Sequence, residues 1–434
     1  MKALISLVLI LIASVTYAED WQRLVSDKTK QVINGVIETR HDFHAHPELG
    51  NREFKTAEKI AARLRALGFD EVTTGVAHTG VVGILKGGQP GAVVALRADM
   101  DGLPVTEKTG LAFASKVTTE WRGRETGVMH ACGHDAHMAI LLGVAEVLSG
   151  MREQIPGTVK FIFQPAEEGA PEGEEGGAAL MIKEGVLEGE YAPGAIFGLH
   201  VFPTPAGLIM YKPEGMMAAA DSFKITVKGV QTHGSSPWSG VDPITVSAQI
   251  INSLQSIVSR QIDLSAAPAV VTIGSINGGN RGNIIPEQVE MTGTIRTLDQ
   301  KMRTDVHARV KRTAELVAKS FGATAEVDIP LGLPVTFNHP ELTAQMAPVL
   351  DRVSAGEKAI VIKPVMGAED FSYFSNQIPG LFIGLGVAAD GKAPGESASN
   401  HSPYFYVNDK ALPVGVEVLS SLALDWLHKQ KDVL

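Results

Sequence analysis

The 434-residue sequence predicts an α/β protein of two domains, one of them inserted into the other. Apolar runs bounded by glycine or proline alternate with helical patterns in the first half of the chain, which is typical of a sheet buried on both faces. In the middle of the chain, polar and apolar residues alternate along the strands, as in an antiparallel sheet with one face in water. After about residue 332 the first rhythm returns. The middle module is therefore predicted to be an insertion.

The N-terminus predicts a signal peptide. Lys2 precedes the 13-residue apolar run ALISLVLILIASV, and the small-residue pattern that ends at Ala18 predicts cleavage there. This run is too short for an ordinary membrane span, although an uncleaved anchor is the alternative. We therefore expect residues 1–18 to be removed and the mature chain, without a stable membrane span, to be periplasmic or secreted.

The larger domain is predicted to combine residues 19–212 with residues 331–434. Its predicted elements are helices at 54–69 and 136–148, strands at 92–100, 158–165, 195–201, 207–211, 360–366 and 380–387, and a helix at 412–429. Ionisable residues stand where three of these strands end: Asp99, Asp101, Glu167, Glu168 and His200. Because sites assemble at the carboxyl ends of strands in open α/β sheets, we expect these side chains to gather there.

The inserted domain is predicted to cover residues 213–330. Its predicted elements are a strand at 221–229, a helix at 242–260, strands at 269–277 and 287–297, a helix at 301–322 and a strand at 323–329. This β-α-β-β-α-β order is the split βαβ arrangement of ferredoxin-like modules.

Composition narrows the classes of partner. The chain is 44% hydrophobic and 20% charged, which is enough apolar material for large cores, and its formal net charge is -10. An acidic chain without lysine and arginine runs argues against nucleic acid or an anionic membrane as a partner.

The only cysteine, Cys132, stands among His130, His134 and His137 in the stretch VMHACGHDAH. A lone cysteine has no partner for an intramolecular disulfide, so it is either a buried small hydrophobe or a reactive or metal-bound thiolate. Together with the strand-end residues and His401, this stretch supplies thiolate, imidazole and carboxylate groups. Such donors suit Zn²⁺ or a related borderline metal.

Ten motifs in chain order carry a resemblance to a known family: HDFHAHPELG, LRADMDGLP, HACGHDAHMA, FIFQPAEEG, FGLHVFP, THGSSPWSGVDPI, GNIIPE, GTIRT, GAEDF and NHSP. The chain resembles the aminoacylase and carboxypeptidase type of dinuclear metallohydrolases, and within it the amidohydrolase branch of hippurate hydrolases and auxin-conjugate hydrolases. Gly102, Ala136 and Ser235 depart from the family pattern, and the EGAPEGEEGG loop is enlarged. These departures leave the choice of substrate open.

The resemblance implies a zinc-peptidase-like α/β/α catalytic domain that binds two divalent metals, Zn²⁺ or Mn²⁺, with Co²⁺ or Ni²⁺ as further options. The implied ligands are Cys132, His134, Glu168, His200 and His401. Cys132 is implied to bridge the two metals as a thiolate, and Asp99 to orient a ligand imidazole. His130 and His137 are not ligands in the family pattern and are interpreted as neighbours of the ligands or as packing residues.

The resemblance also implies the roles of the residues that act on substrate. Glu167 would be the general base that takes a proton from water and delivers it to the leaving amine. The inserted domain would be a lid and a homodimerisation domain, whose His233 contacts the substrate, often in the active site of the partner subunit. Asn283 and Arg296 are candidates for binding the substrate α-carboxylate.

The predicted function is therefore an exported amidohydrolase that cleaves N-acyl-L-amino acids, with hippurate-like substrates, into a carboxylic acid and a free amino acid. A metallo-carboxypeptidase or dipeptidase acting on short peptides is the alternative with the same metals and base. A metal-carrying or ligand-binding protein without catalysis is an alternative from another class, but such a protein has no need of Glu167. A cysteine hydrolase would not explain the Glu167–Glu168 pair, and no G-x-S-x-G motif of a serine hydrolase occurs.

Overall fold

The computed structural model describes residues 2–354, 359–392 and 395–431, with side chains from residue 21 onward. The chain divides into two compact units. The first unit contains Met1–Pro213, Asn338–Ile362 and Tyr373–Leu434, and the second contains Glu214–Phe337 and Lys363–Ser372. The sequence does not predict that the short segment Lys363–Ser372 joins the second unit.

A mixed eight-stranded sheet organises the first unit. Its strand order is β1 (Glu71–Val76), β2 (Gly80–Lys86), β6 (Pro156–Gln164), β3 (Gln89–Asp99), β7 (Ala195–Phe202), β18 (Gly380–Gly386), β8 (Ile209–Tyr211) and β17 (Ile360–Val361). The four central strands β6, β3, β7 and β18 are parallel, whereas β2 runs antiparallel to β6 and β8 antiparallel to β18. Side chains of the central strands are buried almost throughout, which explains their continuous apolar sequences.

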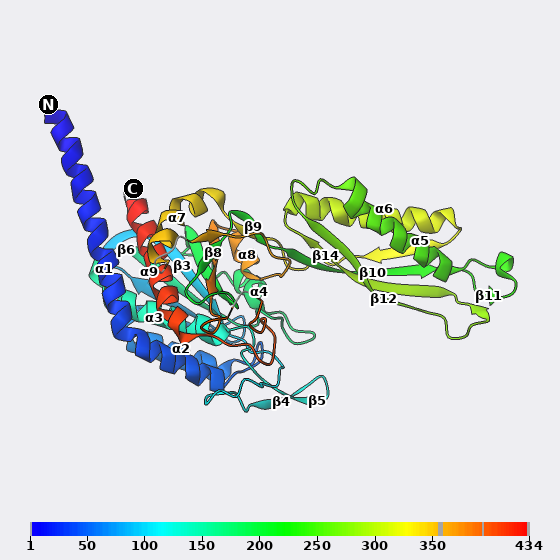
Figure 1. Cartoon of the computed structure of the whole chain (residues 1–434), viewed down its shortest axis with the longest axis horizontal. Helices are drawn as coiled ribbons and strands as arrows, with labels where there is room; N and C mark the ends of the chain where they lie inside the picture. The colour runs from blue at the N-terminus through cyan, green and yellow to red at the C-terminus, as the bar shows by residue number, and fades with distance from the viewer. Residues whose placement is uncertain (1, 355–358, 393–394, 432–434) are drawn as a thin grey trace. The chain divides into compact units, whose positions relative to one another are not determined.

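Helices of the first unit pack on this sheet and on one another. They are α1 (Lys2–Ala45), α2 (Phe54–Ala66), α3 (His134–Ser149), α4 (Gly177–Lys183), α7 (Pro340–Val353), α8 (Phe371–Ser375, shared with the second unit) and α9 (Leu412–Lys431). Helices α3 and α9 contact β3, and α1 contacts both helices (Figure 1). Nearly every side chain of α3 is buried, as expected for a helix whose sequence is apolar on all sides.

Helix α1 begins at residue 2, so the backbone of most of the predicted signal peptide is helical. Residue 1 lies outside the described residues, and side chains are described only from Trp21, which is buried together with Val25 and Phe43. In the described part of the chain, no helix combines the length and the apolar character needed to cross a membrane. Cleavage after Ala18 stays a prediction.

Several elements differ from the sequence-based predictions. The predicted helix at 242–260 is α-helical only over α5 (Pro243–Ser256) and ends in a π-helical turn, Ile257–Gln261. The predicted strand at 360–366 is limited to the two exposed residues of β17. Strand β1 is not predicted, because its sequence EVTTGV has mostly exposed side chains and therefore no strong apolar pattern.

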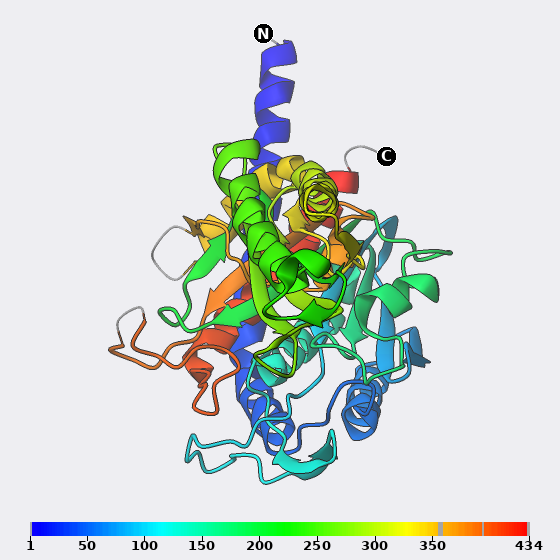
Figure 2. The same ribbon diagram turned by 90° about the vertical axis from the view of Figure 1, so that its right-hand side faces the viewer.

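The second unit is built on an antiparallel sheet of four strands, in the order β12 (Ala269–Gly278), β14 (Gln288–Thr297), β10 (Ala219–Lys228) and β15 (Thr324–Asp328). Helices α5 and α6 (Gln300–Ser320) lie side by side and pack their apolar faces on this sheet (Figure 1, Figure 2). Buried and exposed residues alternate along most of β10, so one face of the sheet meets the helices and the other does not.

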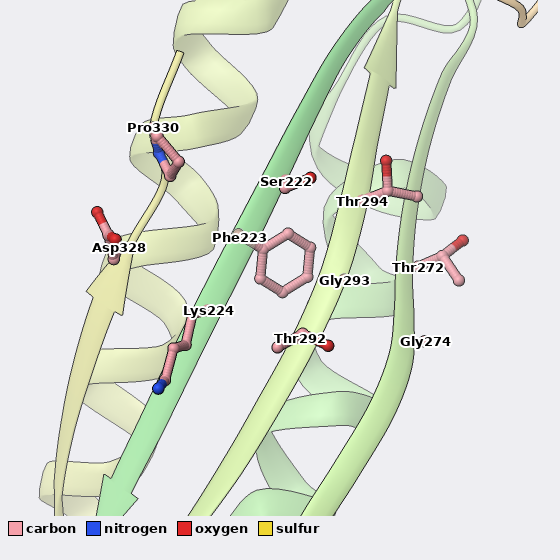
Figure 3. Close-up of a pocket in the computed structure, with 10 residues that line it drawn as sticks. All are labelled: Ser222, Phe223, Lys224, Thr272, Gly274, Thr292, Gly293, Thr294, Asp328 and Pro330. Carbon is pink, nitrogen blue, oxygen red and sulfur yellow. The ribbon is translucent and has the colours of Figure 1, made fainter. Parts of the chain in front are cut away.

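The face of this sheet away from the helices carries hydroxyl groups. Figure 3 shows the side chains of Ser222 on β10, Thr272 on β12, and Thr292 and Thr294 on β14, which line a shallow hollow of about 470 Å³. A polar face of this kind fits the alternation of polar and apolar residues in the sequence.

Candidate metal centre

The parallel register of three central strands brings the predicted ligands of the first unit to one edge of the sheet. Asp99, the last residue of β3, is paired with Gln164, the last residue of β6, and Glu167 follows three residues later. Arg97 of β3 is paired with Gly198 of β7, so His200 lies at the level of Asp99. His200 therefore lies inside β7 rather than after it, but at the expected edge.

A glycine directs the segment between Cys132 and His134. Gly133 has φ of 95°, in the left-handed region, and His134 is the first residue of α3. A Cβ atom on Gly133 would lie 2.3 Å from Cγ2 of Val201, so no larger residue fits there without a shift. This close approach of the chain to β7 puts the Cys132 Sγ 3.2 Å from the His200 Nε2.

The last predicted ligand, His401, comes from a loop far along the chain. Its backbone N–H donates to the carbonyl oxygen of Ala131 at 2.8 Å, and its φ is 69°. The side-chain amide of Asn400 donates to the carbonyl oxygens of Cys132 and Val201, both at 3.1 Å. These hydrogen bonds bring the His401 Nε2 within 2.8 Å of Glu168 Oε1.

Together these elements form overlapping groups of potential ligands whose donor atoms lie within 4.8 Å of one another. One group is Cys132, His134 and His200, and a second is Cys132, Glu168 and His401. The structure thus brings all five predicted ligands together, with Cys132 common to both groups. Glu167 joins His134 and Glu168 in a third group, its Oε2 lying 3.8 Å from the His134 Nε2.

Carboxylates behind the ligands hold the imidazoles. The Nδ1 atom of His134 lies 3.2 Å from Asp101 Oδ1, and 3.8 Å from Asp99 Oδ1. Asp99 makes its shorter contact, 2.6 Å, with the Nδ1 of His137, whose Nε2 accepts from the backbone N–H of Val201. Asp101 therefore accepts the hydrogen bond of His134, a predicted ligand, and Asp99 accepts that of His137.

The surroundings of His134 suit a cation. Burial lowers the pKa of His134, but Asp99 and the hydrogen bond with Asp101 outweigh it and hold the pKa well above its ordinary value. The Nε2 of His134 is buried, and no hydrogen-bond partner for it is found among the described residues. A buried nitrogen without such a partner, in a site that favours positive charge, fits a metal ligand.

The surroundings of His401 also favour a positive charge. Hydrogen bonds with Cys132 and Glu168 raise the pKa of His401 from 6.5 to about 10, so a positive charge is favoured between these two side chains. A thiol, imidazoles and a carboxylate at this spacing fit a zinc-like divalent metal.

His130 differs from the ligands. It is buried, and neither ring nitrogen has a hydrogen-bond partner within the described part of the chain. Burial lowers the pKa of His130 to about 4, so its imidazole is neutral at physiological pH. It belongs to none of the ligand groups found among the described residues.

The three predicted substrate-binding residues of the second unit do not form one cluster there. His233, in β11 (Thr232–His233), pairs with Ile284 of β13 (Ile284–Ile285). Gly234 donates its N–H to the carbonyl oxygen of Asn283, so His233 and Asn283 are neighbours. Arg296 instead lies on β14, where it pairs with Ala220 and Val270.

A hollow of about 960 Å³ adjoins the ligands in the first unit. Its lining residues are Trp121, Arg122, Glu168, Gly169, Ala170, Pro171 and Glu172. Trp121 ends β4 (Thr118–Trp121), and the left-handed Arg122 (φ 49°) and Gly123 (φ 74°) turn the chain into β5 (Arg124–Gly127). The guanidinium carbon of Arg122 lies 5.6 Å from the centre of the Trp121 ring. The lining of this hollow therefore combines an aromatic side chain, a cationic side chain and the predicted ligand Glu168.

Comparison with known proteins gives a consistent match over most of the chain. A model of the peptidase family M20/M25/M40 matches residues 95–425. The chain is 40% identical over 412 residues to "Thermostable carboxypeptidase 2" of Saccharolobus solfataricus, covering 94% of this chain and 99% of that protein. It is 38% identical over 390 residues to "N-acetylcysteine deacetylase" of Bacillus subtilis, covering 90% of this chain and 96% of the relative.

A solved structure is similar as well. It is the structure of a Bacillus subtilis protein that is described as a dinuclear metal binding peptidase from the M20 family. The TM-score is 0.77 and the sequence identity 35%, with 92% of this chain and 99% of that chain covered. Both the sequence and the fold are thus similar to those of a dinuclear protein.

Proposed function

Because the chain belongs to peptidase family M20/M25/M40 and is a hydrolase of amide bonds, we propose that its substrates are N-acyl-L-amino acids, including hippurate-like ones. The products are a carboxylic acid and a free amino acid. A relative named for deacetylation of N-acetylcysteine, an N-acyl amino acid, supports this substrate class. The observation that carries the proposal is that Glu167 lies beside His134 and Glu168, two of the five predicted ligands.

Two divalent metals fit the ligand groups that share Cys132, and Zn²⁺ or Mn²⁺, or else Co²⁺ or Ni²⁺, is proposed to bind there. Cys132, His134, Glu168, His200 and His401 would hold them. When bound, such metals lower the pKa of water toward neutrality and polarise a carbonyl oxygen.

Glu167 is the proposed general base. It removes a proton as the water oxygen adds to the amide carbon, and it delivers that proton to the nitrogen when the C–N bond breaks. Its neighbour Glu168 instead reaches His401 at 2.8 Å, so two adjacent carboxylates serve different partners. Ala166, just before the pair, has φ of 50°, so the chain turns sharply where the two carboxylates begin.

The hollow beside Glu168 is the proposed site of the acyl group. Trp121 offers an aromatic surface there, with Arg122 beside it, which suits flat acyl groups such as benzoyl. His233, Asn283 and Arg296 of the second unit are proposed to bind the substrate oxyanion and α-carboxylate, with the unit acting as a lid and as the contact surface of a homodimer. His233 would serve the partner subunit.

The proposal also places the enzyme outside the cytoplasm. The apolar run after Lys2 and the pattern ending at Ala18 support removal of residues 1–18 and a periplasmic or secreted mature enzyme. N-terminal sequencing of the protein recovered from the periplasm or the medium tests this; an intact Met1 in the cytoplasmic fraction contradicts it.

Hydrolysis of short peptides by a carboxypeptidase or dipeptidase activity is the second candidate. It is favoured by the relative named "Thermostable carboxypeptidase 2", which is 40% identical to this chain. The same ligands and Glu167 would serve that reaction, and only the group occupying the hollow would differ.

A substrate panel tests both candidates. Purified protein is chelated, reloaded separately with Zn²⁺ or Mn²⁺, and assayed for amino-acid release from N-benzoyl, N-acetyl, long-chain N-acyl and indole-acyl amino acids and from dipeptides. We expect metal-restored cleavage of acyl amino acids. Cleavage of dipeptides alone would favour the peptidase. No activity with any metal and substrate would reject both candidate functions.

The variant Glu167→Gln tests the base. We expect turnover to fall by about 10²- to 10⁴-fold, the usual contribution of general acid–base catalysis, while the metal content is unchanged. Glu188→Gln, which alters an exposed glutamate of the same unit, is the matched control. Retention of most activity by Glu167→Gln would remove Glu167 from this role.

A further inference from the structure

We propose that Glu53 is a positioning residue. It fixes the turn of the chain at residues 166–168, called the corner below, and thereby orients the side chains of Glu167 and Glu168. This inference rests on the proposed function of Glu167 as the base. It assigns a catalytic purpose to a buried carboxylate that belongs to no ligand group found among the described residues.

The carboxylate of Glu53 reaches directly to the corner. Its Oε1 accepts the backbone N–H of Ala166 at 2.9 Å, and its Oε2 accepts the hydroxyl of Thr79 at 2.5 Å. All three residues are 2% exposed or less. A buried N–H that lost this acceptor would remain without a partner, which is unfavourable.

The corner needs such support because its backbone is strained. Ala166 has φ of 50°, in the left-handed region that residues with a Cβ seldom adopt. A conformation of this kind is strained and persists only where surrounding contacts enforce it. Gly50 supplies a second contact, since a Cβ on it would lie 2.9 Å from the carbonyl oxygen of Gly169 and 3.1 Å from the Cα of Ala166.

The corner is held on both sides of Glu167. Glu53 accepts the N–H of Ala166 before it, and Asp101 Oδ2 accepts the N–H of Glu168 after it, at 3.0 Å. With both flanking amides fixed, the directions in which Glu167 and Glu168 leave the chain are fixed as well. In this arrangement Glu167 Oε2 lies 3.8 Å from the His134 Nε2 and Glu168 Oε1 lies 2.8 Å from the His401 Nε2.

Helix capping does not account for Glu53. It occupies the residue before α2, yet its side chain makes no capping hydrogen bond to that helix. Glu48 does so instead, accepting from the N–H groups of Lys55 and Thr56 and from the Thr56 hydroxyl. Glu48 therefore caps the helix, whereas Glu53 bonds to Ala166, and the two glutamates can be compared by mutation.

Three variants of the full-length protein test the proposal. Glu53→Leu removes the acceptor, Glu53→Gln keeps an oxygen for the Ala166 N–H, and Glu48→Ala weakens the helix end without touching the corner. With metal reloaded, we expect Glu53→Leu to lower kcat by about 10²-fold, as for a reacting group displaced by about 1 Å, with KM changed less than about threefold. Glu53→Gln should restore most of kcat, and Glu48→Ala should keep it.

Amide hydrogen exchange of the segment 163–169 gives a second measure that does not depend on turnover. Protection of the Ala166 N–H should be lost in Glu53→Leu and kept in the other two variants. If Glu53→Leu does not fold, Glu53→Asp replaces it, because its shorter side chain withdraws the acceptor, and a fall in kcat beyond that of Glu53→Gln is expected.

The outcomes separate the two proposals. A wild-type enzyme that is silent toward every substrate overturns the proposed function. An active wild type whose kcat and Ala166 protection survive Glu53→Leu, or survive Glu53→Asp where that variant stands in, overturns the positioning role. An equal loss of kcat in Glu48→Ala also overturns it, because the effect would then be general destabilisation.

Discussion

The two units of this protein differ in what they bury. The first unit encloses Arg40, Arg97, Asp99 and Asp135 together with two of its predicted histidine ligands, His134 and His200, all at 5% exposure or less. The core of the second unit is a cluster of apolar side chains, and Asp221 and Arg303 form a buried ion pair beside it. Because buried charge is costly unless it is paired, the first unit holds its buried charges in pairs such as Arg40–Asp135 and Arg97–Asp99.

Two matched substitutions test this contrast with the largest expected effect. Asp135 accepts from the Arg40 Nε at 2.9 Å and contacts the His44 Nδ1 at 2.8 Å, whereas Asp221 is held by Arg303 and His307. Breaking a buried pair costs about 3–5 kcal/mol, so Asp135→Asn and Asp221→Asn should lower the free energy of unfolding comparably. Urea denaturation measures this loss.

Their effects on metal should differ. Asp135 directly follows the proposed ligand His134, so Asp135→Asn should also weaken metal binding, whereas Asp221→Asn should leave the metal content of the folded fraction unchanged. Elemental analysis after dialysis against limiting metal measures this. Equal metal loss in both variants would mean that the two units are not separable in this way.

The pH dependence of stability comes next. Burial lowers the pKa of His44, but Asp135 and Glu107 outweigh it and raise the pKa from 6.5 to about 9. The protonated imidazole therefore contributes stability that is complete below pH 6.5 and lost as pH rises through 9, about 3 kcal/mol in all. The difference in unfolding free energy between wild type and His44→Gln should shrink over this range; a constant difference would contradict the pairing.

Removal of the proposed metals should destabilise the first unit only. A ligand at 100 times its dissociation constant stabilises the folded state by about 2.7 kcal/mol, and the groups that share Cys132 lie wholly in the first unit. After chelation, hydrogen exchange should rise in α3 and β7 and stay unchanged in β12 and β14. Equal increases in both units would contradict a local effect.

The smallest effect is expected at a helix end of the second unit. The Asp299 side chain accepts the N–H of Met302 at the start of α6, and loss of such a cap costs about 1 kcal/mol. Asp299→Ala should lower the thermal midpoint slightly and leave kcat unchanged. Asp299→Asn, which keeps a capping oxygen, should behave like wild type, and an equal loss in both variants would assign the effect to charge.

The sequence predicted the family well because the evidence was local. The resemblance carried by the ten motifs is confirmed by the family model, and with it the hydrolysis of amide bonds. Buried strands such as β3 and β7 were predictable because their apolar runs are continuous. The polar strand β1 and the hairpin of β4 and β5 were missed, since neither has such a pattern.

The supporting residues of the centre could not be predicted in the same way. In the sequence, Glu53 resembles any charged residue at the start of a helix. Only its hydrogen bond with Ala166, 113 residues away, distinguishes it from the others. Asp101 likewise looks like a turn residue until its contact with His134 is seen. Long-range contacts of this kind leave no periodic signal in one sequence.

The anchoring of Asn400 to Cys132, across 268 residues, bears on how the protein is made. A ribosome has to pass residue 400 before this loop exists, and the loop can dock only on a finished strand β7, because Asn400 also bonds to Val201. A nascent or truncated polypeptide therefore holds at most part of the ligand set.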